Sequence, residues 1–329
     1  MRQIVLERPG CLVERRVSAP RREPGMVLVR VRRVGICGSD FHAYAGRQPA
    51  YTFPRVLGHE LAGEVLEVPE ESPGLRPGDR CAIEPYVSCG VCRPCRLGRY
   101  NCCQDLKLYG LHIDGGMQPL LNVPPHLIHP SATLSYDQLA LVETLGIGAH
   151  AVSRAQLQPG ESTLVVGAGP IGLAVAQFAV AVGAHVQVVE RNPVRLEFAR
   201  RLGLNASERL DEQLFDAVFD ATGSAEMMAR SLELVAPAGR LVFVGLCPGT
   251  VTLNDPLFHK REITLYASRN SAGQFPRVIQ LMEQGKLDTS SWITHRLKLT
   301  EVPVRMPALL GRPELIKAVV EIEDSDLEV

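Results

Sequence analysis

The chain has 329 residues, more than a single hydrophobic core usually supports, so we expect two domains. Its 35 basic and 36 acidic residues give a formal net charge of -1, which provides no electrostatic basis for binding nucleic acid or an anionic membrane. The opening segment MRQIVLERPG lacks the basic region and apolar stretch of a signal peptide. We therefore expect a cytoplasmic protein with reduced thiols and with no nucleic-acid or membrane partner.

From residue 1 to about residue 130, short β-rich runs alternate with glycine and proline turns. Three of these runs read MVLVRVRRVGI, LAGEVLEV and RCAIEP, and the turn before the third contains RPGD. The pattern predicts a small antiparallel, barrel-like unit rather than helices. A helical pattern follows over residues 135–155.

From residue 160 to about residue 269, strand-like and helix-like segments alternate, beginning with STLVVG and PIGLAVAQFAVAVG. This βαβ rhythm predicts an α/β domain with a parallel sheet and right-handed crossovers. After residue 275 the pattern is mixed, and a helix is expected in FPRVIQLMEQGKL.

The segment GAGPIG has the G-x-G-x-x-G spacing of a dinucleotide-binding loop, directly after a strand and at the start of a helix. Its glycines would let the backbone approach a pyrophosphate; the alternative is a turn that serves only strand–helix packing. Glu190 ends the next strand and can accept hydrogen bonds from a ribose, which favours NAD over NADP, although Arg191 beside it could receive a 2′-phosphate. The predicted cofactor-binding residues are Gly167, Gly169, Pro170, Ile171, Gly172, Glu190, Arg191 and Arg195.

The segment CGVCRPCRLGRYNCC is dense in cysteine, with the spacing C-x2-C-x2-C-x7-C. Four thiolates on short turns form the closed tetrahedral site that structural zinc prefers, and such a site braces a loop rather than catalysing a reaction. Coincidental free thiols and a redox C-x-x-C pair are the alternatives, but no thioredoxin-like βαβ context surrounds the cysteines. The predicted ligands are Cys89, Cys92, Cys95 and Cys103.

A second, dispersed group of candidate metal ligands is spread over three segments. One thiolate, one imidazole and one carboxylate can hold a metal while leaving a position open for substrate. Single histidines and cysteines usually serve packing, so the spacing alone does not establish this site. The candidates are Cys37, Ser39, Asp40 and His42 in VGICGSDFH, His59 and Glu60 in RVLGHELAGEV, and Glu143 in LVETLGIGAHAV.

The segments GICGSDFHAYAG, PRVLGHELAGEV, the four-cysteine run, VVGAGPIGLAVAQFA and FDATGS occur in this order. Together they resemble the zinc-dependent medium-chain alcohol dehydrogenase family over essentially the whole chain. The resemblance implies a GroES-like β-barrel catalytic domain over residues 1–147 and 273–329, with a structural zinc lobe at about 86–105. It also implies a Rossmann, doubly wound parallel-sheet domain over 148–272 that binds NAD, and an active site in the cleft between the domains.

The resemblance implies two Zn²⁺ ions per chain, a structural one and a catalytic one held by Cys37, His59 and either Glu60 or Glu143. It places the Ser39 hydroxyl beside the substrate oxygen and Asp40 close by as a supporting acid. His42 corresponds to a residue that passes protons outwards in some members. The acids Glu60 and Glu143 would exchange as ligands or hold the metal-bound water.

The same resemblance selects Cys103 as the fourth structural ligand. Cys102 falls where the family has an apolar residue, so we expect it to be a packed free thiol. A homodimer or homotetramer is also implied, with REITLYAS (residues 261–268) as the candidate edge strand for joining Rossmann domains.

Two segments, CGSDFHAYAGRQPAYTFPRVLGHE and SRNSAGQFPRVIQLMEQGKLDTSSWITH, are similar to dehydrogenases of sugar acids of the L-gulonate and L-galactonate 5-dehydrogenase type. Arg269 and Asn270 would then contact the substrate, with Arg269 pairing with its carboxylate or, alternatively, simply facing solvent. The other candidate substrates are threonine, sorbitol-like polyols and simple alcohols. A non-catalytic NAD-binding regulator is the alternative from another class, and it would have lost the metal ligands that this chain retains.

Overall fold

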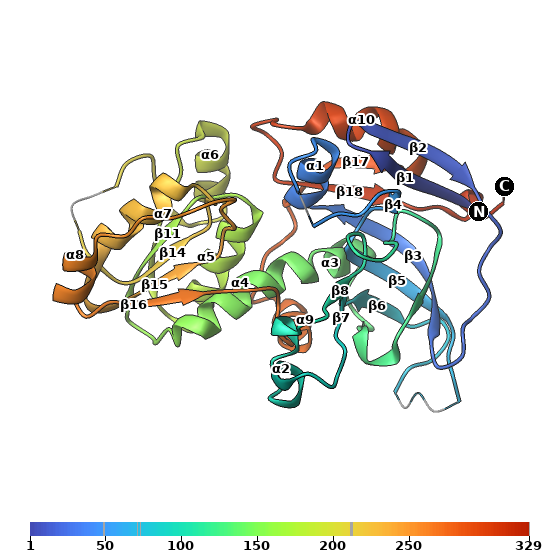
Figure 1. Ribbon diagram of the computed structural model, residues 1–329, viewed down its shortest axis with the longest axis horizontal. Helices are drawn as coiled ribbons and strands as arrows, with labels where there is room; N and C mark the ends of the chain where they lie inside the picture. The colour runs from blue at the N-terminus through green and yellow to red at the C-terminus, as the bar shows by residue number, and fades with distance from the viewer. Residues whose placement is uncertain (49, 71, 73, 211–212, 329) are drawn as a thin grey trace. The chain divides into compact units, whose positions relative to one another are not determined.

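The computed structural model describes residues 1–48, 50–70, 72, 74–210 and 213–328. The chain forms two compact units (Figure 1). Unit 1 comprises Met1–Glu143, Phe275–Glu283 and Thr289–Val329, and unit 2 comprises Thr144–Gln274 and Gln284–Asp288. No helix in the described part of the chain is long and apolar enough to cross a membrane.

Unit 2 contains a six-stranded sheet in the order β13-β12-β11-β14-β15-β16, and every pairing in it is parallel. This confirms the parallel sheet predicted from the βαβ rhythm. Its elements are β11 (Ser162–Val166), α5 (Pro170–Val182), β12 (His185–Val189), α6 (Pro193–Arg201), β13 (Asn205–Ser207), β14 (Phe215–Asp220), α7 (Ala225–Ser231), η3 (Leu232–Leu234), β15 (Val235–Phe243), α8 (Asp255–Lys260) and β16 (Thr264–Ala267), preceded by α4 (Val142–Ala155).

The strand order of this sheet reverses at β11, because β12 pairs on one side of it and β14 on the other. The carboxyl end of β11 is therefore a topological switch point, where open α/β sheets bind their ligands. The GAGPIG loop leaves the sheet at this end, between β11 and α5. β16 lies at the edge of the sheet, as predicted for the segment REITLYAS.

Unit 1 is built on a seven-stranded sheet in which β10, β6, β5, β3, β18 and β17 follow in order and β9 also pairs with β3; β2, β1 and β4 form a second sheet. The strands are β1 (Arg2–Arg8), β2 (Cys11–Arg16), β3 (Val27–Ile36), β4 (Arg55–Val56), β5 (Glu60–Glu67), β6 (Arg80–Ile83), β7 (Tyr86–Val87), β8 (Lys107–Leu108), β9 (Leu120–Val123), β10 (Ile128–Pro130), β17 (Ile293–Lys298) and β18 (Lys317–Glu321). The helices are α1 (Gly38–Tyr44), α2 (Arg93–Arg96), η1 (Tyr100–Cys102), η2 (Pro125–Leu127), α3 (Tyr136–Ala140), α9 (Phe275–Glu283), η4 (Leu299–Glu301), α10 (Val302–Leu309) and η5 (Asp324–Asp326).

The antiparallel strand pairing predicted for residues 1–130 is present, but this region also contains short helices, and the tail adds a parallel strand pair to the sheet. β17 and β18 pair in parallel, because the chain crosses between them through α10, and parallel neighbours need such a crossover. The short helix α1 follows β3 directly, and its first turn is closed by the Asp40 carboxylate, which accepts a hydrogen bond from the Cys37 N–H at 3.0 Å.

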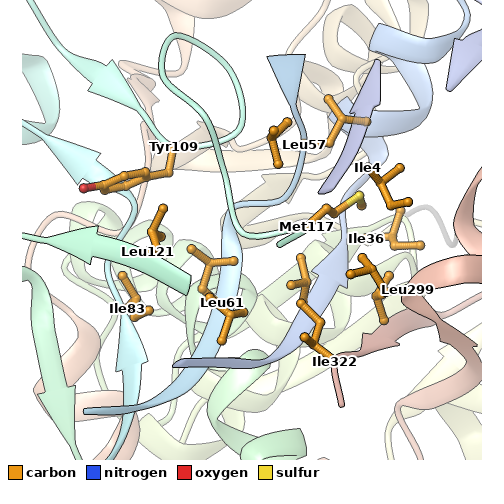
Figure 2. Close-up of a cluster of buried hydrophobic side chains, with 14 of the residues drawn as sticks. Ile4, Ile36, Leu57, Leu61, Ile83, Tyr109, Met117, Leu121, Leu299 and Ile322 are labelled. Carbon is orange, nitrogen blue, oxygen red and sulfur yellow. The ribbon is translucent and has the colours of Figure 1, made fainter. Parts of the chain in front are cut away.

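A cluster of buried apolar side chains joins the N-terminal, central and C-terminal segments of unit 1 (Figure 2). Each large aliphatic side chain that is buried in this way contributes about 1.5–3 kcal/mol. The C-terminal tail is therefore part of the core that supports the barrel. The residues of this cluster that Figure 2 labels are Ile4, Ile36, Leu57, Leu61, Ile83, Tyr109, Met117, Leu121, Leu299 and Ile322.

Candidate active site

Three of the dispersed candidate ligands come together in unit 1. The Cys37 Sγ, a ring nitrogen of His59 and a carboxylate oxygen of Glu60 all lie within 4.8 Å of one another. Cys37 is the N-cap of α1, and Glu60 is the first residue of β5. His59 and Glu60 are buried, whereas Cys37 is partly exposed.

The glycine before His59 is required by the local geometry. Gly58 has φ +97°, and a Cβ atom there would lie 2.5 Å from the Cγ1 of Val34. A side chain would therefore clash with β3 and would adopt a backbone conformation that L residues disfavour. The GHE sequence thus turns the chain so that the next two side chains enter the cluster.

The environment of His59 fits a bound cation. Its Nε2 lies 3.5 Å from the Ser39 Oγ, while its buried Nδ1 lies 3.7 Å from an Asp40 oxygen and has no hydrogen-bond partner among the described residues. Burial alone would lower the pKa of His59, but the charges of Asp40 and Cys37 outweigh burial and raise that pKa well above its ordinary value. A carboxylate behind a ligating imidazole is the usual support of a metal-bound histidine.

Glu143 lies beside this cluster but does not belong to it. Its buried carboxylate, in the first turn of α4, accepts a short hydrogen bond from the Tyr86 hydroxyl. Burial is the main cause that raises the pKa of Glu143, and the charge of Glu60 raises it further. Its role as an exchanging ligand or as a holder of water stays a prediction.

Sequence reasoning missed Lys317, the first residue of β18. Its Nζ donates to both carboxylate oxygens of Glu60, at 2.6 Å and 2.8 Å, and both side chains are buried. Burial would lower the pKa of Lys317, but the neighbouring charges of Glu60 and Cys37 raise it. The available signal was a single lysine in the otherwise apolar run LIKAVV.

Ser39 and His42 lie on the same short helix, α1, directly after Cys37. Ser39 is partly buried beside His59, whereas His42 is exposed. The predicted roles of Ser39 beside the substrate oxygen and of His42 in passing protons outwards stay predictions. Asp40 is held from its other side by the Tyr51 hydroxyl at 3.1 Å, a contact that sequence reasoning also missed.

The four predicted structural ligands, Cys89, Cys92, Cys95 and Cys103, form the second cluster of unit 1. The Cys92 sulfur lies 3.4 Å from that of Cys95 and 3.9 Å from that of Cys103. Sulfur atoms around tetrahedral zinc are about 3.8 Å apart, whereas disulfide sulfurs are about 2 Å apart. The separations fit a zinc site and exclude disulfides between these pairs.

The pKa values of the cysteines in this cluster are also consistent with a metal site. Hydrogen bonds from the backbone of Gln104 and Cys95 lower the pKa of Cys92 to about 6, which favours the thiolate. Burial and the neighbouring thiols raise the pKa of Cys95 to about 12, so the metal-free cluster retains protons that zinc would displace.

The expectation that Cys102 is a packed thiol is wrong. Cys102 is exposed at the end of η1, whereas Cys103 is buried. Asn101, on the other side of Cys102 in the chain, is buried. Cys102 therefore faces solvent, although it is free as expected.

The nucleotide loop in unit 2 has the close backbone packing that its glycines predicted. Gly167 has φ +99°, and a Cβ atom on Gly172 would lie 1.8 Å from the Gly167 carbonyl oxygen. Gly169 caps α5, and Pro170 begins the helix. The loop therefore presents bare backbone at the N-terminus of a long helix, which suits a pyrophosphate.

Glu190 is fixed against this loop. One carboxylate oxygen accepts from the Ala168 N–H and the other from the Asn192 N–H, each at 2.8 Å. Each oxygen keeps a second lone pair with which a ribose hydroxyl could bond. Arg195 lies near Gly169, with its Nη1 3.8 Å from the position of a Cβ there, whereas Arg191 is exposed.

Arg269 and Asn270 follow β16 in unit 2. Arg269 is exposed, and Asn270 has φ +55°. Their contact with a substrate stays a prediction.

Comparison with known proteins agrees with two metal sites and a nucleotide-binding loop in this chain. Residues 23–133 match the alcohol dehydrogenase GroES-like domain, and residues 170–284 match the zinc-binding dehydrogenase domain. The L-galactonate-5-dehydrogenase of Escherichia coli (strain K12) is 38% identical over 97% of this chain and 98% of its own. This chain belongs to the zinc-dependent medium-chain alcohol dehydrogenase family.

Two solved structures of similar proteins contain a nicotinamide cofactor. A zinc-binding dehydrogenase from Sinorhizobium meliloti 1021 bound to NADP has a TM-score of 0.91 and 28% identity, covering 97% of this chain and 98% of that one. The alcohol dehydrogenase rspB from Escherichia coli CFT073 complexed with NADH has a TM-score of 0.90 and 29% identity, covering 98% and 99%. For this medium-chain dehydrogenase, the four-cysteine cluster is the structural zinc site, and Cys37, His59 and Glu60 form the catalytic metal site.

Adjacent cysteines allow a matched test of the structural site. Cys103→Ser should lose the zinc of this site and lower the melting temperature by roughly 5 °C, the shift that a loss of about 2 kcal/mol produces in a domain of this size. Cys102→Ser should keep both the zinc content and the melting temperature, because this thiol is exposed. Metal analysis and thermal melting of the two variants measure the difference, and equal zinc loss in both would contradict the assignment.

Proposed function

We propose that this enzyme oxidises a secondary alcohol of a sugar acid, such as L-gulonate or L-galactonate, with NAD as the oxidant. The observation that carries the reaction type is a Cys37–His59–Glu60 cluster of three metal-binding side chains in the same chain as a bare dinucleotide loop. The L-galactonate-5-dehydrogenase that matches nearly the whole chain supports the choice of substrate class. Reduced cysteines as zinc ligands also fit the cytosol as the compartment.

When bound, zinc supplies Lewis acidity that lowers the pKa of a substrate hydroxyl, and the nicotinamide ring accepts a hydride. Cys37, His59 and Glu60 would hold the metal and leave one side open to the substrate. The Ser39 hydroxyl, next to the His59 ring, would accept a hydrogen bond from the substrate hydroxyl. The exposed His42 on the same helix would pass the proton to solvent, and Tyr86 fixes the carboxylate of Glu143.

The substrate class can be tested with a panel of hexonates, sorbitol, threonine and ethanol, each with NAD. We expect the highest kcat/KM with a hexonate, and faster NAD reduction with ethanol or sorbitol than with any hexonate would reject the sugar acid. Arg269→Met should raise KM for the acids by about tenfold and leave that for sorbitol unchanged, because the proposed ion pair exists only with a carboxylate.

Cys37→Ser serves as the control for the reaction type. This variant should fold and bind NAD but lose about 10³-fold or more in kcat, because the metal that polarises the hydroxyl loses a ligand. Near wild-type turnover would contradict the proposed mechanism. Absence of turnover with every member of the panel would instead favour a non-catalytic NAD-binding regulator.

The preference for NAD rests on Glu190, whose carboxylate would repel a 2′-phosphate. Glu190→Gln keeps an acceptor for the loop but removes the charge, so kcat/KM for NADP relative to NAD should rise at least about tenfold. Glu197→Gln removes an exposed charge from α6 and should leave the ratio unchanged. A wild-type enzyme that already prefers NADP would reject the proposal.

We also propose that the enzyme is a homodimer or homotetramer joined through β16. This strand lies at the edge of the parallel sheet, where its unpaired backbone groups can extend the sheet into a second copy. Light scattering should give a mass of two or four chains at micromolar concentration. Replacing Leu265, at the centre of β16, by proline should produce monomers. A monomeric wild-type protein would contradict the proposal.

A further inference from the structure

The ion pair between Glu60 and Lys317 spans three strands of the barrel sheet. Glu60 begins β5, Lys317 begins β18, and β3 lies between them in the sheet. Glu60 pairs with Gly35 of β3, and Gly35 pairs in turn with Val319 of β18. Since side chains two residues apart on a strand share a face, Lys317 lies on the same face as Val319 and Glu60.

Gly35 is what allows the two charged groups to meet across β3. A Cβ atom at this position would lie 2.0 Å from the Glu60 Oε2. Any other residue would therefore push the carboxylate out of the place where it contacts Lys317. The glycine is not explained by its backbone conformation, because its φ lies outside the left-handed region.

The pair lies in a strongly acidic part of the interior. Asp40, Glu60 and Glu143 are all buried, and Lys317 is the only buried lysine or arginine among the described residues. Buried like charges repel one another strongly because little water screens them. His59 faces Asp40, whereas the ammonium of Lys317 is the cation that contacts the Glu60 carboxylate directly.

We propose that Lys317 is a built-in counter-cation of the catalytic metal site, which holds the Glu60 carboxylate in place without metal and limits how tightly metal binds. Lys317 touches Glu60 and acts through it, so it is a positioning residue. A metal ion at Glu60 must share the carboxylate with an ammonium whose hydrogen bonds already occupy both oxygens. The repulsion between the two cations weakens metal binding and leaves Glu60 exchangeable. The proposal rests on the metal site of the proposed function but not on its substrate, so a failed substrate panel would leave it standing.

The test compares Lys317→Met with wild type in enzyme whose four-cysteine site is already filled with zinc. Co²⁺ is titrated into the catalytic site and followed by its visible absorption. We expect Lys317→Met to bind Co²⁺ about tenfold more tightly, because a nearby positive charge is gone. We also compare the melting temperature of Lys317→Met with that of wild type in each state. The difference should be roughly 5 °C larger without metal than with metal, since only the metal-free variant is left with an unpaired buried carboxylate.

Two control variants separate this role from ordinary packing. Lys317→Arg keeps the charge and should retain an affinity for Co²⁺ close to that of wild type. Lys298→Met removes a lysine from a surface ion pair with Glu323 on the same unit and should change neither measurement. Unchanged or weaker Co²⁺ binding by Lys317→Met, with equal loss of melting temperature in both states, would overturn the proposal.

A double variant covers the case in which Lys317→Met does not fold. Glu60→Gln combined with Lys317→Met removes both charges, so the metal-free double variant should fold and melt above the single variant. If the double variant fails to fold as well, the lysine serves packing and the proposal is wrong.

Discussion

The repulsion among buried acids is the constraint on which unit 1 depends. A metal site that takes a thiol, an imidazole and a carboxylate in a dry interior gathers negative charge where water cannot screen it. Three buried acids gather at this site, Asp40, Glu60 and Glu143; each has its own donor, and each donor comes from a different segment. Tyr51 donates to Asp40, Tyr86 to Glu143 and Lys317 to Glu60.

This arrangement gives a physical reason for the discontinuous course of the chain. The last segment returns to unit 1 after unit 2 and places β18 against β3, opposite β5. The crossover through α10 makes β17 and β18 parallel, and both strands then extend the barrel sheet. The tail thus contributes apolar residues such as Leu299 and Ile322 to the core and the buried Lys317 ammonium to the metal site.

Sequence reasoning succeeded where a function is carried by residues close together in the chain. The GAGPIG loop and the four-cysteine run each lie within about fifteen residues, and both form the expected local structures. It failed on Cys102, because the spacing of the cysteines does not determine which of two adjacent side chains is buried; Cys103 is buried and Cys102 is exposed. It also missed Lys317, since a lysine 257 positions from its partner is recognisable only once the strand order is known.

The two metal sites therefore differ in what must be folded before they exist. The four-cysteine site needs only short turns between its ligands, so zinc can organise that lobe locally. The catalytic site requires β3 and β5 in register for Cys37 and Glu60, with the glycine at position 35 aligned between Glu60 and Lys317. A one-residue slip of β5 would turn Glu60 to the opposite face of the sheet. The buried ion pair across β3 consequently favours the one register in which the metal ligands converge, and it does so before any metal binds.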